Sequence, residues 1–279
     1  MSLSPIAPMN KLNIGCGHRA LPGWTNVDFV SVPGLVQAHD LREPLPFAAG
    51  SFALVYHSHV LEHLDRDGAR RLLQECHRVL QPGGLLRVVV PDLEQKARLY
   101  LEKLELAATR SEARTLADHE WTVVEMIDQL VRTRSGGEML RWLQEAAPDS
   151  FAARRIGDEF QRAQAGARQV AAPRGPAPRP GVRERLARRL RQLAGVSETE
   201  WDWLRYRRLG EAHLWMYDRV SLATLLNSTG FTGCEVTTAG TSRQPDWATD
   251  GLWLDVEAGS PRKPDSLYLE AVKPPAPAT

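Results

Sequence analysis

The sequence has little cysteine. Of its 279 residues only three are cysteines, and they are odd in number and far apart. Cys16, Cys76 and Cys234 also fall outside any Cys-x-x-Cys spacing, which argues against a disulfide framework or a structural zinc site. This usage is typical of a reducing compartment, so we expect a cytoplasmic protein.

Long apolar runs and an excess of charge are also missing. No stretch approaches the roughly 20 apolar residues of a membrane-spanning helix, and residues 1–11 lack the pattern of a signal peptide. The 35 Lys and Arg residues nearly balance the 34 Asp and Glu residues, so no overall field attracts nucleic acid. The hydrophobic share of 43% is enough for a core. We therefore expect a globular protein without a nucleic-acid partner or stable membrane insertion, and of unknown oligomeric state.

Basic charge is concentrated in the middle of the chain. Residues 151–210 hold 14 basic and 6 acidic residues, a net charge of +8. A run rich in Ala, Pro, Arg and Gly predicts a flexible loop at 171–182, because proline removes donors and fixes φ. Residues 182–193 have the spacing of a basic amphipathic helix. Its apolar stripe consists of Leu186, Leu190 and Leu193. We expect the stripe to pack against the protein; the alternative is a peripheral contact with a membrane surface or an acidic partner.

Strand-like and helix-like segments alternate in the first hundred residues. The strand-like segments are 11–14, 25–30, 35–39, 52–56 and 85–90. Residues 68–80 have one apolar helical face, and the Gln-Pro-Gly-Gly sequence at 81–84 predicts a helix end followed by a turn. This alternation predicts an α/β fold with a doubly wound parallel sheet that binds ligands at the carboxyl ends of its strands.

A glycine-rich turn follows the first predicted strand. Gly15-Cys16-Gly17 lets the backbone approach a ligand closely, and Asp28 at the end of the next strand can accept two hydrogen bonds from a ribose. The spacing from Gly17 to Asp28 is shorter than the roughly 20 residues of a dinucleotide fingerprint, and Arg19 stands where a third glycine is expected. A nicotinamide enzyme is therefore disfavoured.

Several further motifs follow in order along the chain. They are Leu12-Asn13-Ile14-Gly15-Cys16-Gly17, Pro22-Gly23-Trp24-Thr25-Asn26-Val27-Asp28, His39-Asp40-Leu41, Pro46-Phe47, His59-Val60-Leu61-Glu62-His63-Leu64 and Leu80-Gln81-Pro82-Gly83-Gly84. Together they resemble the motifs of class I S-adenosylmethionine-dependent methyltransferases, in particular a bacterial branch often found among glycan and natural-product genes. The resemblance covers about residues 10–95 and resumes at 217–235 and 266–272.

The resemblance implies a Rossmann-like, seven-stranded sheet with one antiparallel strand, and it assigns the cofactor-binding residues. These are Asn13, Gly15, Cys16, Gly17, Asp28, Asp40, Leu41, His57 and Ser58. The two glycines would face the methionine part, Asp28 the ribose, and Asp40 with Leu41 the adenine. His57 and Ser58 would lie near the sulfonium. Many relatives carry an acidic residue at the position of Asn13, so the contact to the cofactor's ammonium group stays open.

The chain must also hold the methyl acceptor and remove its proton. Histidines are natural bases, because their pKa lies near neutral pH. We expect His213 to be the base, with His57 as the alternative, and Tyr217, expected one helical turn after His213, to orient the acceptor.

The motif His59-x-x-Glu62-His63 offers an alternative to a histidine base, namely a metal site. At helical spacing these three side chains would share one face and could hold a divalent ion that binds an acceptor's hydroxyls. Glu-His also occurs at this place in methyltransferases without metal, and we expect a metal-free mechanism.

The segment between the motifs is predicted to be a helical insertion. We expect a core of residues 1–95 and 212–279 that binds S-adenosylmethionine, and an insertion or cap at 96–211. Helical periodicity covers 93–106, 117–134 and 138–147. The expected core or pocket residues are Trp121, Met126, Ile127, Leu130, Met139, Trp142 and Leu143.

The sequence thus predicts a methyltransferase that uses S-adenosylmethionine, releases S-adenosylhomocysteine and acts on a small molecule. Oxygen of a sugar or other natural product is the expected acceptor atom. The alternatives are N-methylation, action on a lipid-linked glycan, and a cofactor-binding interaction protein without catalysis.

Overall fold

The computed structural model describes residues 10–171, 182–208 and 210–276. The chain divides into two compact units: Met1–Gln95 with Leu214–Thr279, called the core unit here, and Lys96–His213, called the helical unit. The loop predicted at 171–182 lies almost wholly outside the described residues.

A seven-stranded sheet organises the described part of the core unit, with the order β3-β2-β1-β4-β5-β9-β6. The strands are β1 (Lys11–Ile14), β2 (Thr25–Asp28), β3 (Gln37–Ala38), β4 (Phe52–Ser58), β5 (Leu80–Pro91), β6 (Thr232–Thr237) and β9 (Ser266–Val272). The first five are parallel to one another, whereas β9 runs antiparallel to both β5 and β6. The expected sheet with one antiparallel strand is therefore confirmed.

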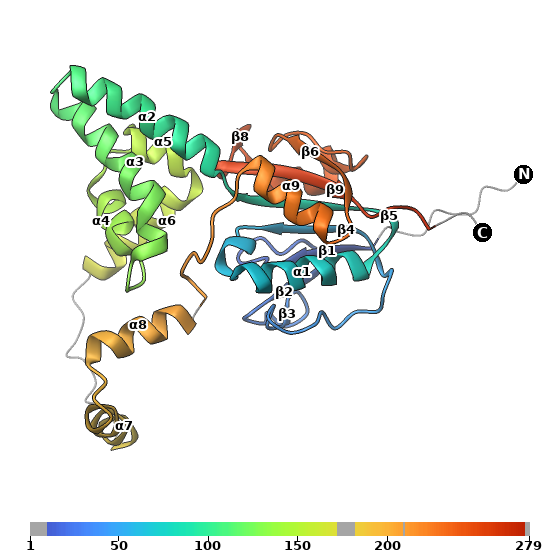
Figure 1. The fold of residues 1–279 in the computed structure, drawn as a ribbon, viewed down its shortest axis with the longest axis horizontal. Helices are drawn as coiled ribbons and strands as arrows, with labels where there is room; N and C mark the ends of the chain where they lie inside the picture. The colour runs from blue at the N-terminus through green and yellow to red at the C-terminus, as the bar shows by residue number, and fades with distance from the viewer. Residues whose placement is uncertain (1–9, 172–181, 209, 277–279) are drawn as a thin grey trace, which may run out of the picture. The chain divides into compact units, whose positions relative to one another are not determined.

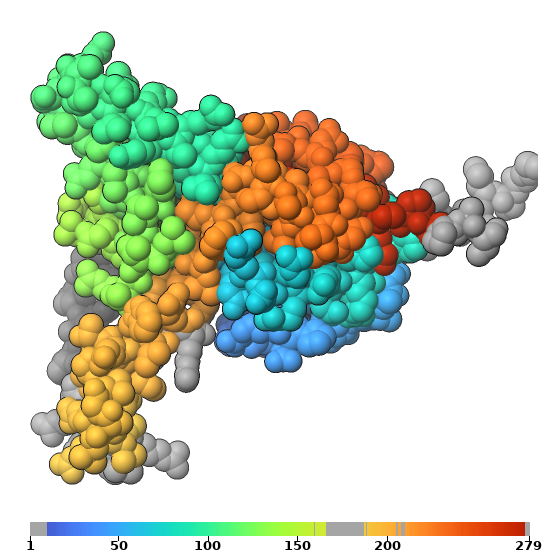
Figure 2. Space-filling view, in the orientation of Figure 1, coloured from blue at the N-terminus to red at the C-terminus, as the bar shows by residue number. Residues whose placement is uncertain are grey.

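Two helices cover one face of this sheet (Figure 1), and Figure 2 shows them side by side. They are α1 (Arg66–Val79) and α9 (Arg219–Ser228). The apolar stripe predicted for the first helix is buried: Leu72, Leu73, Cys76 and Val79 pack with β1, β4 and β5. Asp65 caps α1 by accepting a hydrogen bond from the backbone N–H of Gly68. The helix ends at Val79, as expected, and β5 begins at Leu80. Residues 81–84 interrupt the regular pairing of β5 with β4, because Leu80 pairs with Phe52 and Leu85 pairs with Leu54, and Gly83 there has a left-handed φ of 79°.

The opposite face of the sheet is covered by an irregular segment, residues 238–262. It contains a π-helix at Trp247–Gly251, a 3-10 helix at Leu252–Leu254, and the short strands β7 (Val256–Glu257) and β8 (Ser260–Pro261). Trp247 and Leu254 pack there against Leu54 and Tyr56 of β4. No periodic pattern in the sequence indicated this cover.

The described part of the helical unit consists mainly of helices. These are α2 (Leu93–Thr109, which begins in the core unit), α3 (Ala113–Val131), α4 (Gly137–Glu145), α5 (Phe151–Ile156), α6 (Asp158–Ala171), α7 (Val182–Leu193) and α8 (Glu198–Arg208). None of the described helices is long and apolar enough to cross a bilayer.

Some of the residues expected in the interior of the helical unit are in fact exposed. Trp121, Met139 and Leu143 are buried, and Met126 and Trp142 are partly buried, but Ile127 and Leu130 are exposed. The reason is that α3 buries a more polar face, formed by Trp121, Thr122, Glu125 and Asp128. Lys96 and Arg155 both form ion pairs with Glu125, which stabilises this charge in the interior.

Candidate functional site

The carboxyl ends of β1, β2 and β4 meet at one edge of the sheet, because these strands are parallel neighbours. Directly after β1 the backbone turns through two left-handed glycines, Gly15 with φ of 63° and Gly17 with φ of 50°. A Cβ on Gly15 would come within 2.3 Å of Val60 Cγ2, whereas a Cβ on Gly17 would meet nothing within 4 Å. The turn is therefore tightly packed at Gly15 and open at Gly17.

Asp28 at the end of β2 is held in place by this turn. Its Oδ2 accepts a hydrogen bond from the backbone N–H of Gly17, and its Oδ1 accepts one from Phe29, each with 2.7 Å between the nitrogen and the oxygen. A carboxylate has about four lone-pair sites, so this one retains acceptor capacity after both bonds. The side chain is partly exposed and can accept hydroxyl groups from a ligand.

Asn13 lies beneath the turn. Its side-chain nitrogen donates to the backbone oxygen of Arg19 at 2.9 Å and to Asn26 Oδ1 at 3.2 Å, and only 1% of the residue is exposed. Asn13 therefore shapes the loop between the glycines and Arg19. The Cys16 thiol is also buried, and desolvation, together with the charge of Asp28, raises its pKa to about 11. It stays protonated at neutral pH.

Asp40 and Leu41 follow β3 at the same edge. Arg42 donates two hydrogen bonds from its side chain to Asp40 Oδ2, from Nη2 at 2.6 Å and from Nε at 3.1 Å. These bonds lower the pKa of Asp40 to about 2, which keeps the carboxylate ionised. Leu41 is partly buried against the core.

His57 and Ser58 end β4, and they point to opposite faces of the sheet. His57 is fully buried, and neither ring nitrogen has a hydrogen-bond partner among the described residues. Burial lowers its pKa to about 4, so the ring is neutral at physiological pH. Ser58 is partly exposed, and Lys263 Nζ lies 3.4 Å from its Oγ. Lys263 was not singled out from the sequence, because it lies outside every motif.

The expectation that His59, Glu62 and His63 share a helix face is wrong. His59 has a positive φ of 55° and precedes the 3-10 helix Leu61–His63. Its Nδ1 lies 3.4 Å from Glu62 Oε1, and its Nε2 lies 2.8 Å from Ser266 Oγ. The Glu62 carboxylate is completely buried. The His59 ring is thus fixed between Glu62 and β9.

His213 and Tyr217 do not begin a helix, which corrects another expectation. Residues 213–216 have no regular structure, and α9 starts at Arg219, where Asp218 forms a capping box with Ser221. His213 is 5% exposed, and its backbone N–H donates to the oxygen of Gln129 at 3.1 Å, within the helical unit. Leu214 then enters the core unit and donates its N–H to the backbone oxygen of Glu62 at 2.7 Å.

Tyr217 is anchored at the end of β5. Its backbone oxygen accepts a hydrogen bond from Leu93, and the residue forms a β-bridge with Asp92. The side chain is 3% exposed, and its hydroxyl has no hydrogen-bond partner in the described residues. Desolvation, together with the charge of Glu62, raises its pKa to about 12. The hydroxyl is thus a protonated donor close to the ligand edge.

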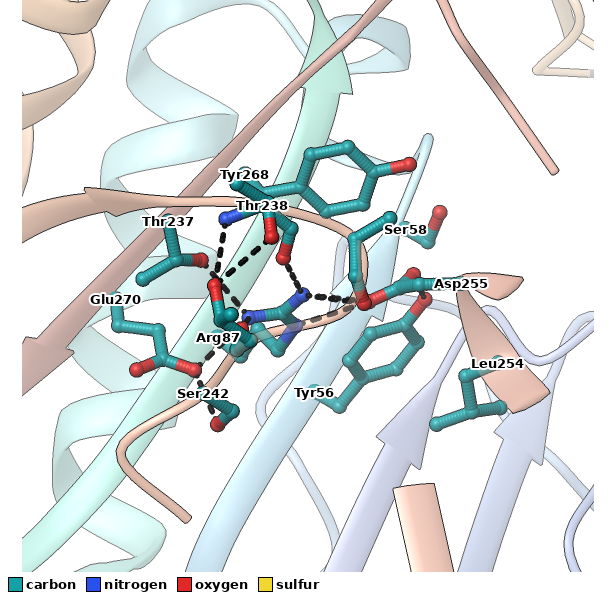
Figure 3. Close-up of polar contacts among 12 residues, drawn as sticks. Tyr56, Ser58, Arg87, Thr237, Thr238, Ser242, Leu254, Asp255, Tyr268 and Glu270 are labelled. Atoms are coloured by element: carbon teal, nitrogen blue, oxygen red, sulfur yellow. Dashed lines mark hydrogen bonds and ion pairs between the residues drawn. The ribbon is translucent and has the colours of Figure 1, made fainter. Parts of the chain in front are cut away.

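A buried charge cluster lies in the middle of the same sheet (Figure 3). Arg87 of β5 donates from Nε to Asp255 and from Nη1 to Glu270 of β9, each at 2.9 Å. Tyr56 donates its hydroxyl to Asp255 at 2.6 Å. All three charged residues are at most 3% exposed. An arginine inside the apolar run 85–90 was the sequence signal, since a buried charge needs partners. The cluster connects the segment 238–262 to the sheet.

Comparison with known proteins gives one family match. A model described as a methyltransferase domain matches residues 23–88. No curated protein matches the sequence.

Solved structures also match. A methyltransferase from Thermotoga maritima, described as S-adenosylmethionine-dependent and possibly a histamine N-methyltransferase, is 12% identical with a TM-score of 0.40, over 96% of this chain and 84% of that one. A methyltransferase from Methanosarcina mazei, also described as S-adenosylmethionine-dependent, is 15% identical with a TM-score of 0.40. The match covers 99% of this chain and 100% of that one. The Burkholderia thailandensis 1,6-didemethyltoxoflavin-N1-methyltransferase, solved with S-adenosylhomocysteine, is 22% identical with a TM-score of 0.26, over 30% and 46%.

Proposed function

We propose that the chain is a class I S-adenosylmethionine-dependent methyltransferase and that it methylates an oxygen atom of a small molecule, a sugar or another natural product. The observation that carries the proposal is the pairing of the open Gly17 turn with the fixed Asp28 carboxylate. The acceptor class is supported by the motif resemblance and by the balanced charge of the chain, which offers no general attraction to nucleic acid.

The residues at the sheet edge fit the cofactor. Gly17 leaves space above the turn, and Asp28 retains acceptor capacity for two ribose hydroxyls. Asp40, kept ionised by Arg42, is the proposed contact for the adenine, with Leu41 beside it. When bound, S-adenosylmethionine supplies a methyl group that is activated by its sulfonium, so the reactivity comes from the cofactor and not from the protein.

The protein has to bring the acceptor oxygen into line with the methyl group and take its proton. Tyr217 is the proposed orienting group, because its buried hydroxyl is protonated and has no hydrogen-bond partner among the described residues. His213 is the proposed base. His57 is a weaker candidate than the sequence suggested, since a histidine with a pKa of about 4 is a poor proton acceptor.

We propose that the reaction takes place in the cytoplasm. The three free cysteines are consistent with this compartment, because its reducing conditions keep thiols from forming disulfides. N-methylation and action on a lipid-linked glycan are the alternatives that the experiment must separate.

The test is a transfer assay with the full chain. Purified protein is incubated with S-adenosylmethionine and matched acceptors that differ only in a hydroxyl or an amine: sugars and amino sugars, phenols and anilines. S-adenosylhomocysteine release and a mass gain of one CH2 unit in the acceptor are read by mass spectrometry. We expect transfer to hydroxyl acceptors, and much slower transfer with the Asp28→Ala variant when the concentration of S-adenosylmethionine is limiting. Transfer to the amines alone, or to added protein or nucleic acid alone, would overturn the proposal.

A further inference from the structure

Helix α7 of the helical unit carries a high density of positive charge. Its twelve residues, Val182–Leu193, include five arginines and a single acidic residue, Glu184. The helix therefore has a net charge of +4 within a segment of net charge +8, residues 151–210. This charge plays no part in the methyl transfer proposed above.

The apolar residues of α7 fall on one side of the helix. With a rotation of about 100° per residue, Val182, Leu186, Leu190 and Leu193 lie within an arc of about 80°. Arg183 and Arg189 flank that arc, one on each side, at about 60° from its centre. An apolar stripe bordered by arginines is the arrangement of a helix that lies in a bilayer interface, where the arginine stems extend toward the headgroups.

The C-terminal part of this stripe is exposed. Leu190 is 58% exposed and Leu193 is 86% exposed. Neither residue belongs to a buried apolar cluster in the part of the chain that the structure describes. The expectation that these leucines pack against the protein is therefore wrong for Leu190 and Leu193. Two neighbouring exposed leucines on one helix face gain free energy from any apolar environment that covers them.

We propose that α7 binds the surface of an anionic lipid bilayer, with its leucines at the acyl boundary and its arginines at the headgroup phosphates. Charge complementarity supports an anionic partner. Nucleic acid would satisfy the arginines, but its phosphate backbone offers no apolar phase for Leu190 and Leu193. The contact is peripheral, and it is independent of the proposed methyl transfer.

Co-sedimentation of the full chain with vesicles tests the proposal. The vesicles consist of phosphatidylcholine alone or of phosphatidylcholine with phosphatidylglycerol, each at low and high salt. We expect binding to the anionic vesicles that weakens as salt is raised. Leu190→Ser with Leu193→Ser removes the apolar anchor and should weaken binding about tenfold or more. Arg183→Gln with Arg189→Gln should weaken it to a similar degree, since each basic residue contributes near an anionic surface.

The matched control is Leu101→Ser, which changes a leucine of α2 that is 59% exposed and lies outside α7. It should leave vesicle binding unchanged, and circular dichroism should show the same helix content in all variants. Equal binding to both vesicle types, no binding to either, or binding unaffected by the leucine changes would each overturn the proposal. So would tighter binding to a DNA duplex than to the anionic vesicles, if it persists in the leucine variant.

Discussion

The carboxylate of Asp28 accepts a hydrogen bond from the backbone N–H of Gly17, with 2.7 Å between Gly17 N and Asp28 Oδ2. The acidic residue proposed to bind the ribose therefore also holds the turn proposed to face the methionine part. Loss of this side chain affects both ends of the cofactor site.

Asp28→Ala should weaken the binding of S-adenosylhomocysteine by at least about tenfold, because charge-assisted hydrogen bonds to two hydroxyls are lost. Isothermal titration calorimetry measures the affinity. Asp67→Ala, which removes an exposed carboxylate from α1, serves as the control and should bind normally. Unchanged affinity in Asp28→Ala would place the cofactor elsewhere.

The two glycines of the turn should differ in their response to alanine. Gly15→Ala creates a contact of 2.3 Å with Val60 Cγ2 as well as left-handed strain, so we expect a loss of roughly 2–4 kcal/mol in unfolding free energy. Gly17→Ala meets no atom within 4 Å and should cost only the backbone strain, about 1–2 kcal/mol.

Denaturant unfolding compares these variants, with Val60→Ala as the partner in a double-mutant cycle. Truncating Val60 should make the Gly15→Ala change less costly. If the losses of unfolding free energy in Gly15→Ala and Val60→Ala were additive in the double variant, the contact with Val60 would not be the reason that Gly15→Ala is destabilising.

His57 should make the stability of the core unit depend on pH. Its pKa in the folded protein is about 4, below the ordinary value of 6.5, so the unfolded chain binds the proton more tightly. The contribution of neutral His57 to the free energy of unfolding is therefore complete above pH 6.5, and it is lost as the pH falls from 6.5 toward 4. Between pH 7.5 and pH 5 the loss is about 2 kcal/mol.

Thermal unfolding of the wild type and His57→Leu across this range measures the effect. The variant should be less sensitive to acid than the wild type and should retain transferase activity. Loss of activity with a normal fold would restore His57 as the base.

His213, Tyr217 and a possible metal can be separated in one set of assays. We expect activity to survive EDTA and to fall by about 10²–10⁴ in kcat in His213→Ala, with cofactor affinity kept. Tyr217→Phe removes a hydroxyl without a hydrogen-bond partner in the described residues, so its melting temperature should not fall, whereas kcat/KM for the acceptor should. Turnover that EDTA abolishes and Mg²⁺ or Mn²⁺ restores would overturn the metal-free mechanism.

The Arg87 cluster should be critical for the fold rather than for catalysis. Arg87→Met leaves Asp255 and Glu270 buried without their shared cation, which should cost about 3–5 kcal/mol. Adding Asp255→Asn and Glu270→Gln should recover part of that loss. Arg42→Met, at an exposed ion pair, should change stability by less than about 1 kcal/mol in the same unfolding assay.

The elements with a regular apolar pattern could be predicted from the sequence. The run 85–90 and the stripe of Leu72, Leu73, Cys76 and Val79 occur in the expected strand and helix, because burial on a sheet follows their periodicity. Over the segment 238–262 as a whole, the apolar residues do not recur at the spacing of a helix or a strand. This segment is held by contacts distant in sequence, such as Asp255 with Arg87, and no local rule could place it.

The errors near the site also have local causes. His213 and Tyr217 have helical spacing, but Asp218 is the cap, and its Asp-x-x-Ser sequence was an available signal for a helix start after Tyr217. His59, Glu62 and His63 have the spacing of a helix face, but the left-handed backbone at His59 could not be foreseen for a residue other than glycine.

The position of β9 in the sheet affects how the chain can fold while it is synthesised on the ribosome. This strand follows β6 in the chain, yet it lies between β5 and β6 in the sheet and pairs with both. On the ribosome, β6 therefore has no strand to join until residues 266–272 have emerged, so the sheet cannot be completed stepwise in the order of synthesis. Until then β5 exposes an unpaired edge, a surface on which nascent chains can associate wrongly. Of the strands in this sheet, the one that is synthesised last therefore closes its interior.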